Sequence, residues 1–176
     1  MRLFLAINFN DETKQKLTAL QSRLRENSLR GNFTAYENLH LTLVFLGEVA
    51  GSRIGALHKA MGNVPVSPFD LCIRGIGSFR RDGGDILWAG VDAGKSLAAL
   101  YSNLCSQLSS AGFEVEARKY TPHLTLAREA VLREDFDQAD FSRGTGAIYV
   151  RVSKISLMKS ERINGRLAYT ELLPGK

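Results

Sequence analysis

The tetrapeptide His-Leu-Thr-Leu occurs twice in this chain, at residues 40–43 and again at residues 123–126. The two copies begin 83 positions apart, which is close to half of the 176-residue length. The chain has 3 histidines, 8 threonines and 24 leucines, so a given histidine is followed by Leu-Thr-Leu by chance with a probability on the order of 0.001. Internal repetition is the better explanation, and it predicts a protein built from two similar halves.

A His-x-Thr sequence on a β-strand places both polar side chains on one face, because side chains alternate between faces along a strand. The imidazole and the hydroxyl then lie about 6.6 Å apart, and the flanking leucines point the other way, into a core. Two such strands facing each other would form a symmetric cleft with two groups that titrate near neutral pH.

The composition is that of an ordinary globular protein, with 44% hydrophobic and 23% charged residues, and it excludes wholesale disorder. A net charge of +5 permits an anionic partner such as RNA without requiring one. Cys72 and Cys105 are the two cysteines and lack CxxC spacing, which argues against a zinc knuckle or a disulfide scaffold and suits the reducing cytoplasm. The apolar run at residues 3–7 is too short for a signal-peptide core or a membrane span. We therefore expect a soluble, cytoplasmic protein.

Hydrophobic periodicity predicts an α+β protein with no linker that would separate domains. Helices are expected after the capping residues Asn10 and Ser52, and over residues 97–108 up to Gly112. Strands are expected at about residues 2–9, 39–46, 69–73, 86–91, from 123, from 148, and on both sides of an Asn164-Gly165 turn, the last one reaching Leu173. Residues 129–146 are expected to be irregular, and a change of hydrophobic parity near Ser153 favours a bulge or bend. Residues 1–176 are predicted to form a single bilobal domain, with motif-bearing halves at about 1–92 and 93–176.

The paired motif is suited to displacement at phosphorus without a metal ion. Such a reaction needs one oxygen deprotonated and another protonated on opposite sides of the phosphoryl group. His40 and His123 could supply one base and one acid, and the symmetry of the motifs does not assign which is which. Thr42 and Thr125 could donate hydrogen bonds to the non-bridging oxygens, where charge accumulates. The chain offers no HExxH or Cys/His spacing for zinc and no recognisable nucleophile elbow. His58 resembles neither copy and is expected to be an ordinary residue of a charged helix.

The sequence resembles the 2H phosphoesterase superfamily, whose name refers to two His-x-Thr-x motifs. Within it, the chain is most similar to the bacterial and archaeal RNA 2′,3′-cyclic phosphodiesterases, historically called 2′-5′ RNA ligases. The likeness extends over nearly the whole chain and is carried by residues 2–7, 37–48, 87–90 and 122–128. It implies two pseudo-twofold-related lobes, each an antiparallel sheet backed by helices, with the active site in a central cleft.

The resemblance also implies the reaction. An RNA with a terminal 2′,3′-cyclic phosphate would be hydrolysed to a 2′-phosphate, with His123 activating the water and His40 protonating the departing 3′ oxygen. Reversible 2′-5′ joining of RNA could accompany it. No cofactor, metal or obligate protein partner is expected, and the protein is expected to be a monomer. The alternatives are a phosphodiesterase for a small cyclic phosphate and a non-catalytic protein that binds RNA ends.

Arg128 matches a phosphate-binding arginine of the family, and a guanidinium suits that task. In an uninterrupted strand, however, Arg128 would share a face with Leu124 and Leu126, opposite to His123. We therefore predict that the strand deviates after Leu126. Phe45 holds the corresponding place in the first copy and is expected to belong to the core.

RNA contacts beyond the phosphate are harder to place. Arg80 and Arg81 could meet the RNA backbone, and Phe79 or Trp88 could stack on a base. A solvated hairpin tip and a core tryptophan are the preferred interpretation of these residues on sequence alone.

Overall fold

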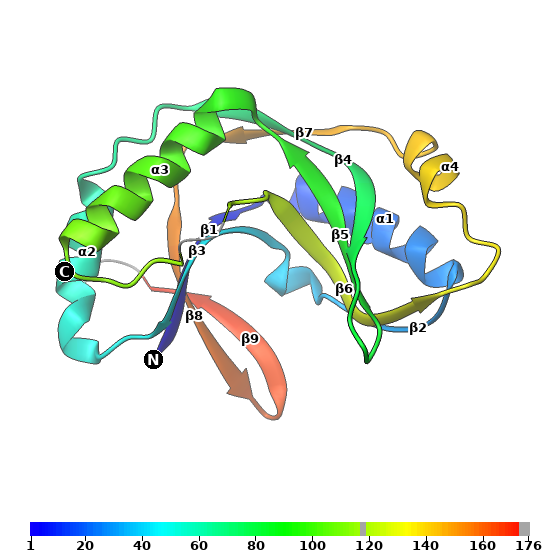
Figure 1. Cartoon of the computed structure of the whole chain (residues 1–176), viewed down its shortest axis with the longest axis horizontal. Helices are drawn as coiled ribbons and strands as arrows, with labels where there is room; N and C mark the ends of the chain where they lie inside the picture. The colour runs from blue at the N-terminus through cyan, green and yellow to red at the C-terminus, as the bar shows by residue number, and fades with distance from the viewer. Residues whose placement is uncertain (117–118, 173–176) are drawn as a thin grey trace.

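The computed structural model describes residues 1–116 and 119–172, which form two antiparallel sheets with helices packed on them (Figure 1). The first sheet has the strand order β3 (His40–Glu48), β1 (Arg2–Asn8), β8 (Ser156–Ile163) and β9 (Arg166–Glu171). The second has the order β2 (Ser28–Phe33), β6 (His123–Leu132), β5 (Asp85–Asp92), β4 (Phe69–Phe79) and β7 (Ile148–Val152). The helices are α1 (Asp11–Glu26), α2 (Ile54–Gly62), α3 (Gly94–Ser110) and α4 (Gln138–Arg143). The predicted α+β class is confirmed.

The repeated unit is a strand, a helix and a second strand that carries the motif. The first copy is β1, α1 and β3, and the second is β5, α3 and β6. Each element of the second copy begins 83 residues after its counterpart: Asp85 follows Arg2, Gly94 follows Asp11, and His123 follows His40 at that interval. The repetition therefore extends well beyond the tetrapeptide that revealed it.

The two copies exchange their helices. Helix α1 connects strands of the first sheet along the chain, yet it contacts β2, β6 and β7 of the second sheet. Helix α3 connects strands of the second sheet, yet it contacts β3 of the first. Each sheet also contains strands from both 1–92 and 93–176, so the sequence halves do not coincide with the two sheets. One continuous core, which includes Leu5 on β1 and Leu124 on β6, joins them.

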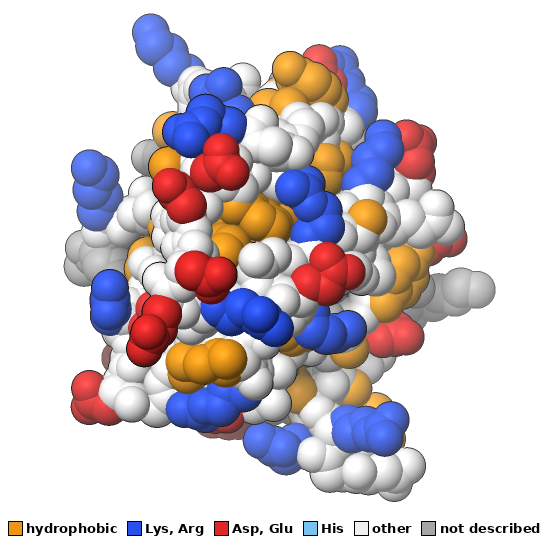
Figure 2. Space-filling model, turned by 90° about the vertical axis from the view of Figure 1, so that its right-hand side faces the viewer, with side chains coloured by type: hydrophobic (Ala, Val, Ile, Leu, Met, Phe, Trp, Pro, Cys, Tyr) orange, Lys and Arg blue, Asp and Glu red, His pale blue; other side chains and the backbone are white. Residues whose placement is uncertain are grey.

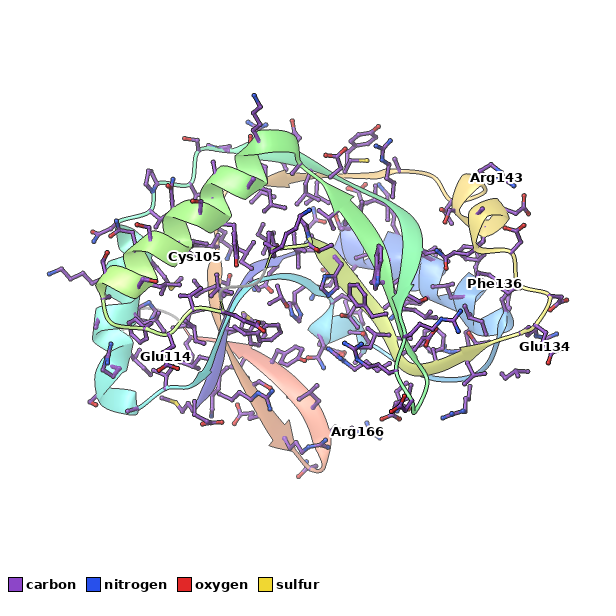
Figure 3. All side chains as sticks on the ribbon, viewed as in Figure 1. Cys105, Glu114, Glu134, Phe136, Arg143 and Arg166 are labelled. Carbon is purple, nitrogen blue, oxygen red and sulfur yellow. The ribbon has the colours of Figure 1, made fainter. Side chains whose placement is uncertain are left out.

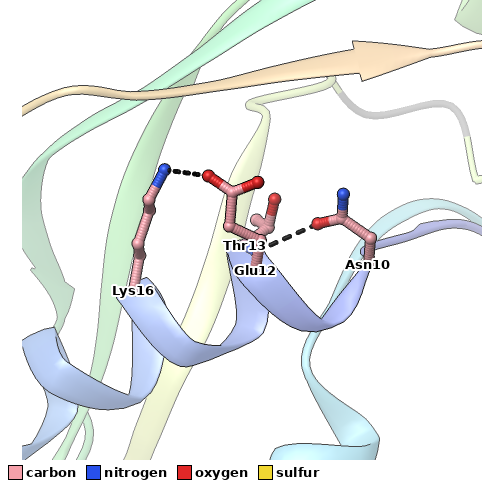
Figure 4. A network of polar contacts seen from close by, with 4 residues as sticks. All are labelled: Asn10, Glu12, Thr13 and Lys16. Atoms are coloured by element: carbon pink, nitrogen blue, oxygen red, sulfur yellow. Dashed lines mark hydrogen bonds and ion pairs between the residues drawn. The ribbon is translucent and has the colours of Figure 1, made fainter.

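The first helix starts where the sequence predicts. The side chain of Asn10 accepts a hydrogen bond from the Thr13 amide at 3.0 Å, and Glu12 pairs with Lys16 at 2.6 Å one turn further on (Figure 4). Gly112 follows α3 with a φ of +74°, a left-handed conformation that glycine adopts without strain. Both predicted helix boundaries are confirmed.

Other expectations about local structure were wrong. Ser52 does not cap α2, which follows a short 3₁₀ turn and has no side-chain cap. Strand β2 was not foreseen, because its polar sequence is stabilised by pairing with β6. Within the supposedly irregular 129–146, β6 continues to Leu132 and Asp137 caps the short helix α4.

The parity change near Ser153 has a larger cause than a bulge. Strand β7 ends at Val152 in the second sheet, and β8 begins at Ser156 in the first, so the chain changes sheets between them. The Asn164-Gly165 turn is confirmed, since both residues have positive φ, 50° and 77°, as a type I′ turn requires. The expected end of the last strand at Leu173 lies outside the described residues. In the part of the chain that the structure describes, no helix is both long and apolar enough to cross a membrane.

Candidate active site

The two motif strands, β3 and β6, lie in contact and present their polar residues to one cleft. His40, Thr42, His123 and Thr125 all line this cleft, whose volume is about 1630 Å³. The four motif leucines are at most 3% exposed, and Leu43 among them also borders the cleft: Leu41, Leu43, Leu124 and Leu126. The tertiary structure thus brings together the two histidines and two threonines that the sequence singled out.

The ring of His40 is fixed by contacts at both nitrogens. Its Nδ1 donates to the carbonyl oxygen of Asn38 at 2.6 Å, and its Nε2 lies 2.9 Å from the hydroxyl of Thr42. A carbonyl oxygen can only accept, so Nδ1 carries the proton, and the unprotonated Nε2 of the neutral ring accepts a hydrogen bond from the Thr42 hydroxyl. Nε2 is therefore the ring nitrogen of His40 that can accept a proton.

Burial lowers the pKa of His40 to about 4, because a charged imidazolium loses hydration among the surrounding rings. Phe4 and Tyr169 each place a ring centroid 5.0 Å from that of His40. The Asn38 carbonyl acts in the opposite direction, and the positive charges of Lys14 and Arg128 lower the pKa further. His40 is therefore neutral in the unliganded protein at neutral pH.

His123 is held by an equivalent contact. Its Nδ1 donates to the carbonyl oxygen of Thr121 at 2.8 Å, two residues upstream, as Asn38 is two residues upstream of His40. Phe79 packs edge-on against the ring, with centroids 5.0 Å apart. The two imidazoles thus have the same tautomer when neutral, and both offer Nε2 for proton transfer.

Each motif strand contains a bulge at the fourth residue of the motif. On β3, Val44 and Thr42 pair with consecutive residues of β1, which leaves Leu43 as the extra residue. On β6, Ala127 and Thr125 pair with consecutive residues of β5, which leaves Leu126 as the extra residue. An extra residue reverses the alternation of side chains beyond it. The predicted deviation of the strand after Leu126 is confirmed.

The bulge turns Arg128 into the cleft. Its side chain is exposed, lines the cleft with the two histidines, and lies close enough to lower the pKa of His40. Phe45, at the equivalent position of β3, is 50% exposed and also lines the cleft. The expectation that Phe45 belongs to the core was wrong, because the bulge at Leu43 acts on it in the same way.

The remaining residues that the sequence analysis considered lie in different places. Phe79 and Arg81 line the cleft, whereas Arg80 is exposed at the hairpin tip and does not. Trp88 packs across Gly77 and contacts Phe79, and its buried Nε1 has no hydrogen-bond partner among the described residues. His58 lies on α2 and does not line the cleft.

Sequence reasoning missed three residues that shape the site. The side chain of Asn38 donates to the Leu167 carbonyl at 2.9 Å and accepts from the Tyr169 amide at 3.2 Å, which fastens β9 beside His40. Tyr120 donates its hydroxyl proton to the carbonyl oxygen of Thr42 at 2.9 Å. The place of Asn38 two residues before a motif was a usable signal. No signal in the sequence pointed to Tyr169, because it lies on β9, near the other end of the chain.

Among the residues that the structure describes, no three His, Cys, Asp or Glu side chains cluster so that they could hold a metal ion. Cys72 and Cys105 are both free thiols.

Known proteins resemble this chain both in sequence and in fold. The model of the 2′-5′ RNA ligase superfamily matches residues 23–164. An RNA 2′,3′-cyclic phosphodiesterase of Thermotoga maritima is 34% identical over 131 residues, which cover 73% of this chain and 70% of that protein. The enzyme of the same name from Methanothermobacter thermautotrophicus is 28% identical over 98% of this chain and 96% of its own. The crystal structure of Escherichia coli LigT with 3′-AMP superposes with a TM-score of 0.79 at 28% identity, covering 98% of this chain and 95% of that one.

Proposed function

The chain belongs to the 2′-5′ RNA ligase superfamily, and from this membership and the cleft geometry we propose that it hydrolyses RNA 2′,3′-cyclic phosphate ends to 2′-phosphates. The observation that carries the proposal is the convergence of His40, Thr42, His123 and Thr125 on one cleft. Two imidazoles, each with Nδ1 bonded to a backbone carbonyl and Nε2 left for proton transfer, can serve as the acid and the base of a displacement at phosphorus. The chemistry needs no metal ion.

In this mechanism His123 takes the proton of the attacking water and His40 protonates the departing 3′ oxygen. A pKa of about 4 leaves His40 without that proton in the unliganded protein. An anionic phosphate beside the ring favours the charged imidazolium and raises the pKa. Substrate binding would therefore prepare His40 for its role as an acid. If the 5′-hydroxyl of a second RNA end attacks in place of water, the same two groups could join RNA ends through a 2′-5′ linkage, with the 3′ oxygen departing as before.

The remaining cleft residues would bind the phosphate and the terminal nucleotide. The hydroxyls of Thr42 and Thr125 donate to the non-bridging oxygens as charge develops on them. Arg128 adds charge-assisted hydrogen bonds from a planar fork. Phe79, which packs against His123, would contact a base, and Arg81, which also lines the cleft, would contact the RNA backbone.

We further propose that the protein acts as a monomer in the cytoplasm, without a cofactor or an obligate protein partner. The free thiols of Cys72 and Cys105 support a reducing compartment. Size-exclusion chromatography with light scattering would test the oligomeric state.

The direct test is to incubate a defined RNA ending in a 2′,3′-cyclic phosphate with the protein in EDTA and to identify the product. A 2′-phosphate is expected. Loss of activity in EDTA with recovery on adding a divalent ion would refute the metal-independent mechanism.

Variants locate the chemistry. His40→Ala and His123→Ala are each expected to lower turnover by at least about 100-fold, a typical contribution of a general acid or base. His58→Ala is the matched control and should stay near wild type. Equal impairment of all three folded variants would show that the active site lies elsewhere.

A further inference from the structure

The cleft carries more positive charge than one terminal phosphate requires. Besides Arg128, it is lined by five basic side chains that form no ion pair with any described residue: Arg2, Arg81, Lys119, Arg162 and Arg166. Two of its acidic side chains are already paired, Glu48 with the N-terminal amine at 3.2 Å and Glu161 with Lys159 at 2.7 Å. The uncompensated cations therefore suit a ligand with several negative charges.

Two of these cations lie on the β8–β9 hairpin, which projects from the body of the molecule (Figure 1). Figure 3 labels Arg166 at its tip, and Arg162 lies on the paired strand, where its Nη1 donates to the Gly165 carbonyl at 3.0 Å. Two apolar side chains are exposed beside them, Ile163 at 50% and Leu167 at 44%. A positively charged surface that follows the backbone is typical of proteins that bind single-stranded nucleic acid, and the two aliphatic side chains add apolar surface beside it.

The hairpin is fastened to the candidate active site. Tyr169 on β9 packs edge-on against His40, and Asn38 bonds the backbone of both Leu167 and Tyr169. Leu167 and Tyr169 are two residues apart on a strand, so their side chains share a face. The hairpin thus extends the cleft wall outward from His40 in a fixed orientation.

The β4–β5 hairpin projects on the same side of the molecule, at the lower edge of Figure 1, and contributes Arg81 to the cleft. The face drawn in Figure 2 has a different character, with Lys and Arg side chains interspersed with Asp and Glu. On that face positive and negative side chains alternate, whereas the five cations named above form no ion pair with a described residue.

We propose that the β8–β9 hairpin binds the RNA strand directly 5′ of the cyclic end, with Arg162 and Arg166 on internucleotide phosphates and Leu167 against a base or ribose. RNA oligonucleotides would then be preferred over nucleoside 2′,3′-cyclic phosphates, because only an oligonucleotide reaches the hairpin. This inference rests on the proposed function, since it assumes that a cyclic phosphate occupies the space between the two histidines.

The test compares two substrates, 2′,3′-cyclic AMP and a five-nucleotide RNA ending in a 2′,3′-cyclic phosphate. The double variant Arg162→Ala/Arg166→Ala should keep kcat/KM for 2′,3′-cyclic AMP within about twofold and lose about tenfold or more for the RNA. The slope of log kcat/KM for the RNA against log salt should become shallower by about 1.4, as expected for two lost phosphate contacts on a single strand.

Two further variants separate charge from fold. Arg162→Lys/Arg166→Lys keeps the charges and should retain most of the salt dependence. Arg133→Ala removes an exposed arginine that does not line the cleft, and it should change neither substrate. An unchanged RNA preference in the alanine double variant, or an equal loss for both substrates, would overturn the inference.

Binding of an RNA that ends in a 2′-phosphate, followed by fluorescence anisotropy, measures the hairpin without turnover. Binding that weakens in the alanine double variant supports the hairpin contact even if neither cyclic substrate is hydrolysed, and that combination would refute the proposed function alone. RNA binding that is unaffected by the double variant would refute the hairpin contact alone.

Discussion

At the scale of single residues, identical tetrapeptides place their histidines in different surroundings. His40 is enclosed by Phe4 and Tyr169, whereas His123 is packed edge-on by Phe79. Both rings have Nδ1 fixed by a backbone carbonyl two residues upstream. Local sequence therefore sets the tautomer of each ring, and distant strands set its environment.

The burial of His40 should be visible in the pH dependence of stability. Its pKa is about 4 in the folded protein and about 6.5 in the unfolded chain, so the unfolded chain binds the proton more readily between these values. The free energy of unfolding should therefore fall as the pH decreases from 6.5 to 4, by at most about 3 kcal/mol from this residue. Urea unfolding of wild type and His40→Asn measures the difference and cancels the contribution of the carboxylates. If the free energies of unfolding of the two proteins fell equally between pH 6.5 and 4, that would contradict a half-buried His40 with a lowered pKa.

The two motif threonines should matter for chemistry rather than for folding. Thr42→Val and Thr125→Val keep the branched shape that suits a strand and remove only the hydroxyl. Single-turnover hydrolysis should slow by about 10- to 1000-fold in each variant, because a hydrogen-bond donor to the developing charge is lost. Thermal melts should stay close to wild type. Unchanged rates would mean that the hydroxyls do not contact the phosphate.

Arg128 should not be replaceable by lysine. Arg128→Lys keeps the charge and loses the two-pronged contact with phosphate oxygens, so kcat/KM should fall at least about tenfold. Arg133→Lys makes the same change at an exposed position that does not line the cleft and should have no effect. Full activity of Arg128→Lys would refute the proposed phosphate-binding role of Arg128, but it would not count against the two-histidine mechanism.

At the scale of elements, the bulges decide which residues reach the cleft. They occur at equivalent places, Leu43 and Leu126, and turn Phe45 on one strand and Arg128 on the other into the cleft. The repeat is therefore symmetric in backbone and asymmetric in chemistry, with an aromatic ring on one side and a guanidinium on the other.

The β4–β5 hairpin tip packs closely on β6 just past Arg128. Gly84 has a φ of +113°, and a Cβ there would lie 2.6 Å from the Glu129 carbonyl carbon, while a Cβ at Gly83 would meet nothing within 4 Å. Gly84→Ala should lower the free energy of unfolding by about 2–4 kcal/mol through strain and overlap. Gly83→Ala should change it by less than about 0.5 kcal/mol. Similar effects of the two substitutions in urea unfolding would contradict this close approach.

At the scale of the whole molecule, the exchanged helices make the sheets interdependent. Gln21 on α1 donates to the Leu126 carbonyl on β6 at 2.8 Å, which ties the helix of the first copy to the motif strand of the second. The hydroxyl of Tyr120, which precedes β6, donates a hydrogen bond to the Thr42 carbonyl oxygen at 2.9 Å. The hydroxyl of Thr34, which precedes β3, donates one to the Thr125 carbonyl oxygen at 3.0 Å. The segment leading into each motif strand is thus bonded to the other motif strand.

This interdependence predicts a single unfolding transition. Trp88, the one tryptophan of the chain, lies on β5 in the second sheet, and Leu5 is fully buried on β1 in the first. Leu5→Ala should cost about 2–5 kcal/mol and should move the Trp88 fluorescence midpoint together with that of far-UV circular dichroism. Leu29→Ala, at a residue that is 68% exposed, should cost less than about 0.5 kcal/mol. If Leu5→Ala left the midpoint of Trp88 fluorescence unchanged, the two lobes would unfold separately.

The sequence by itself determined the repeat, the α+β class, the principal helices, the Asn164-Gly165 turn and the four motif residues that the candidate site contains. These features depend on neighbouring positions along the chain, through strand alternation, helix periodicity and capping. Even the deviation after Leu126 could be inferred, because an unpaired arginine in a leucine core would cost too much.

Only the tertiary structure decided which distant segments meet. Strand β2 exists because β6 pairs with it, the parity change near Ser153 reflects a move between sheets, and Phe45 faces the cleft because β1 aligns with β3 through a bulge. Tyr169 reaches His40 from the other end of the chain. Register and sheet membership are set by the summed burial of many side chains, which no local segment of sequence contains.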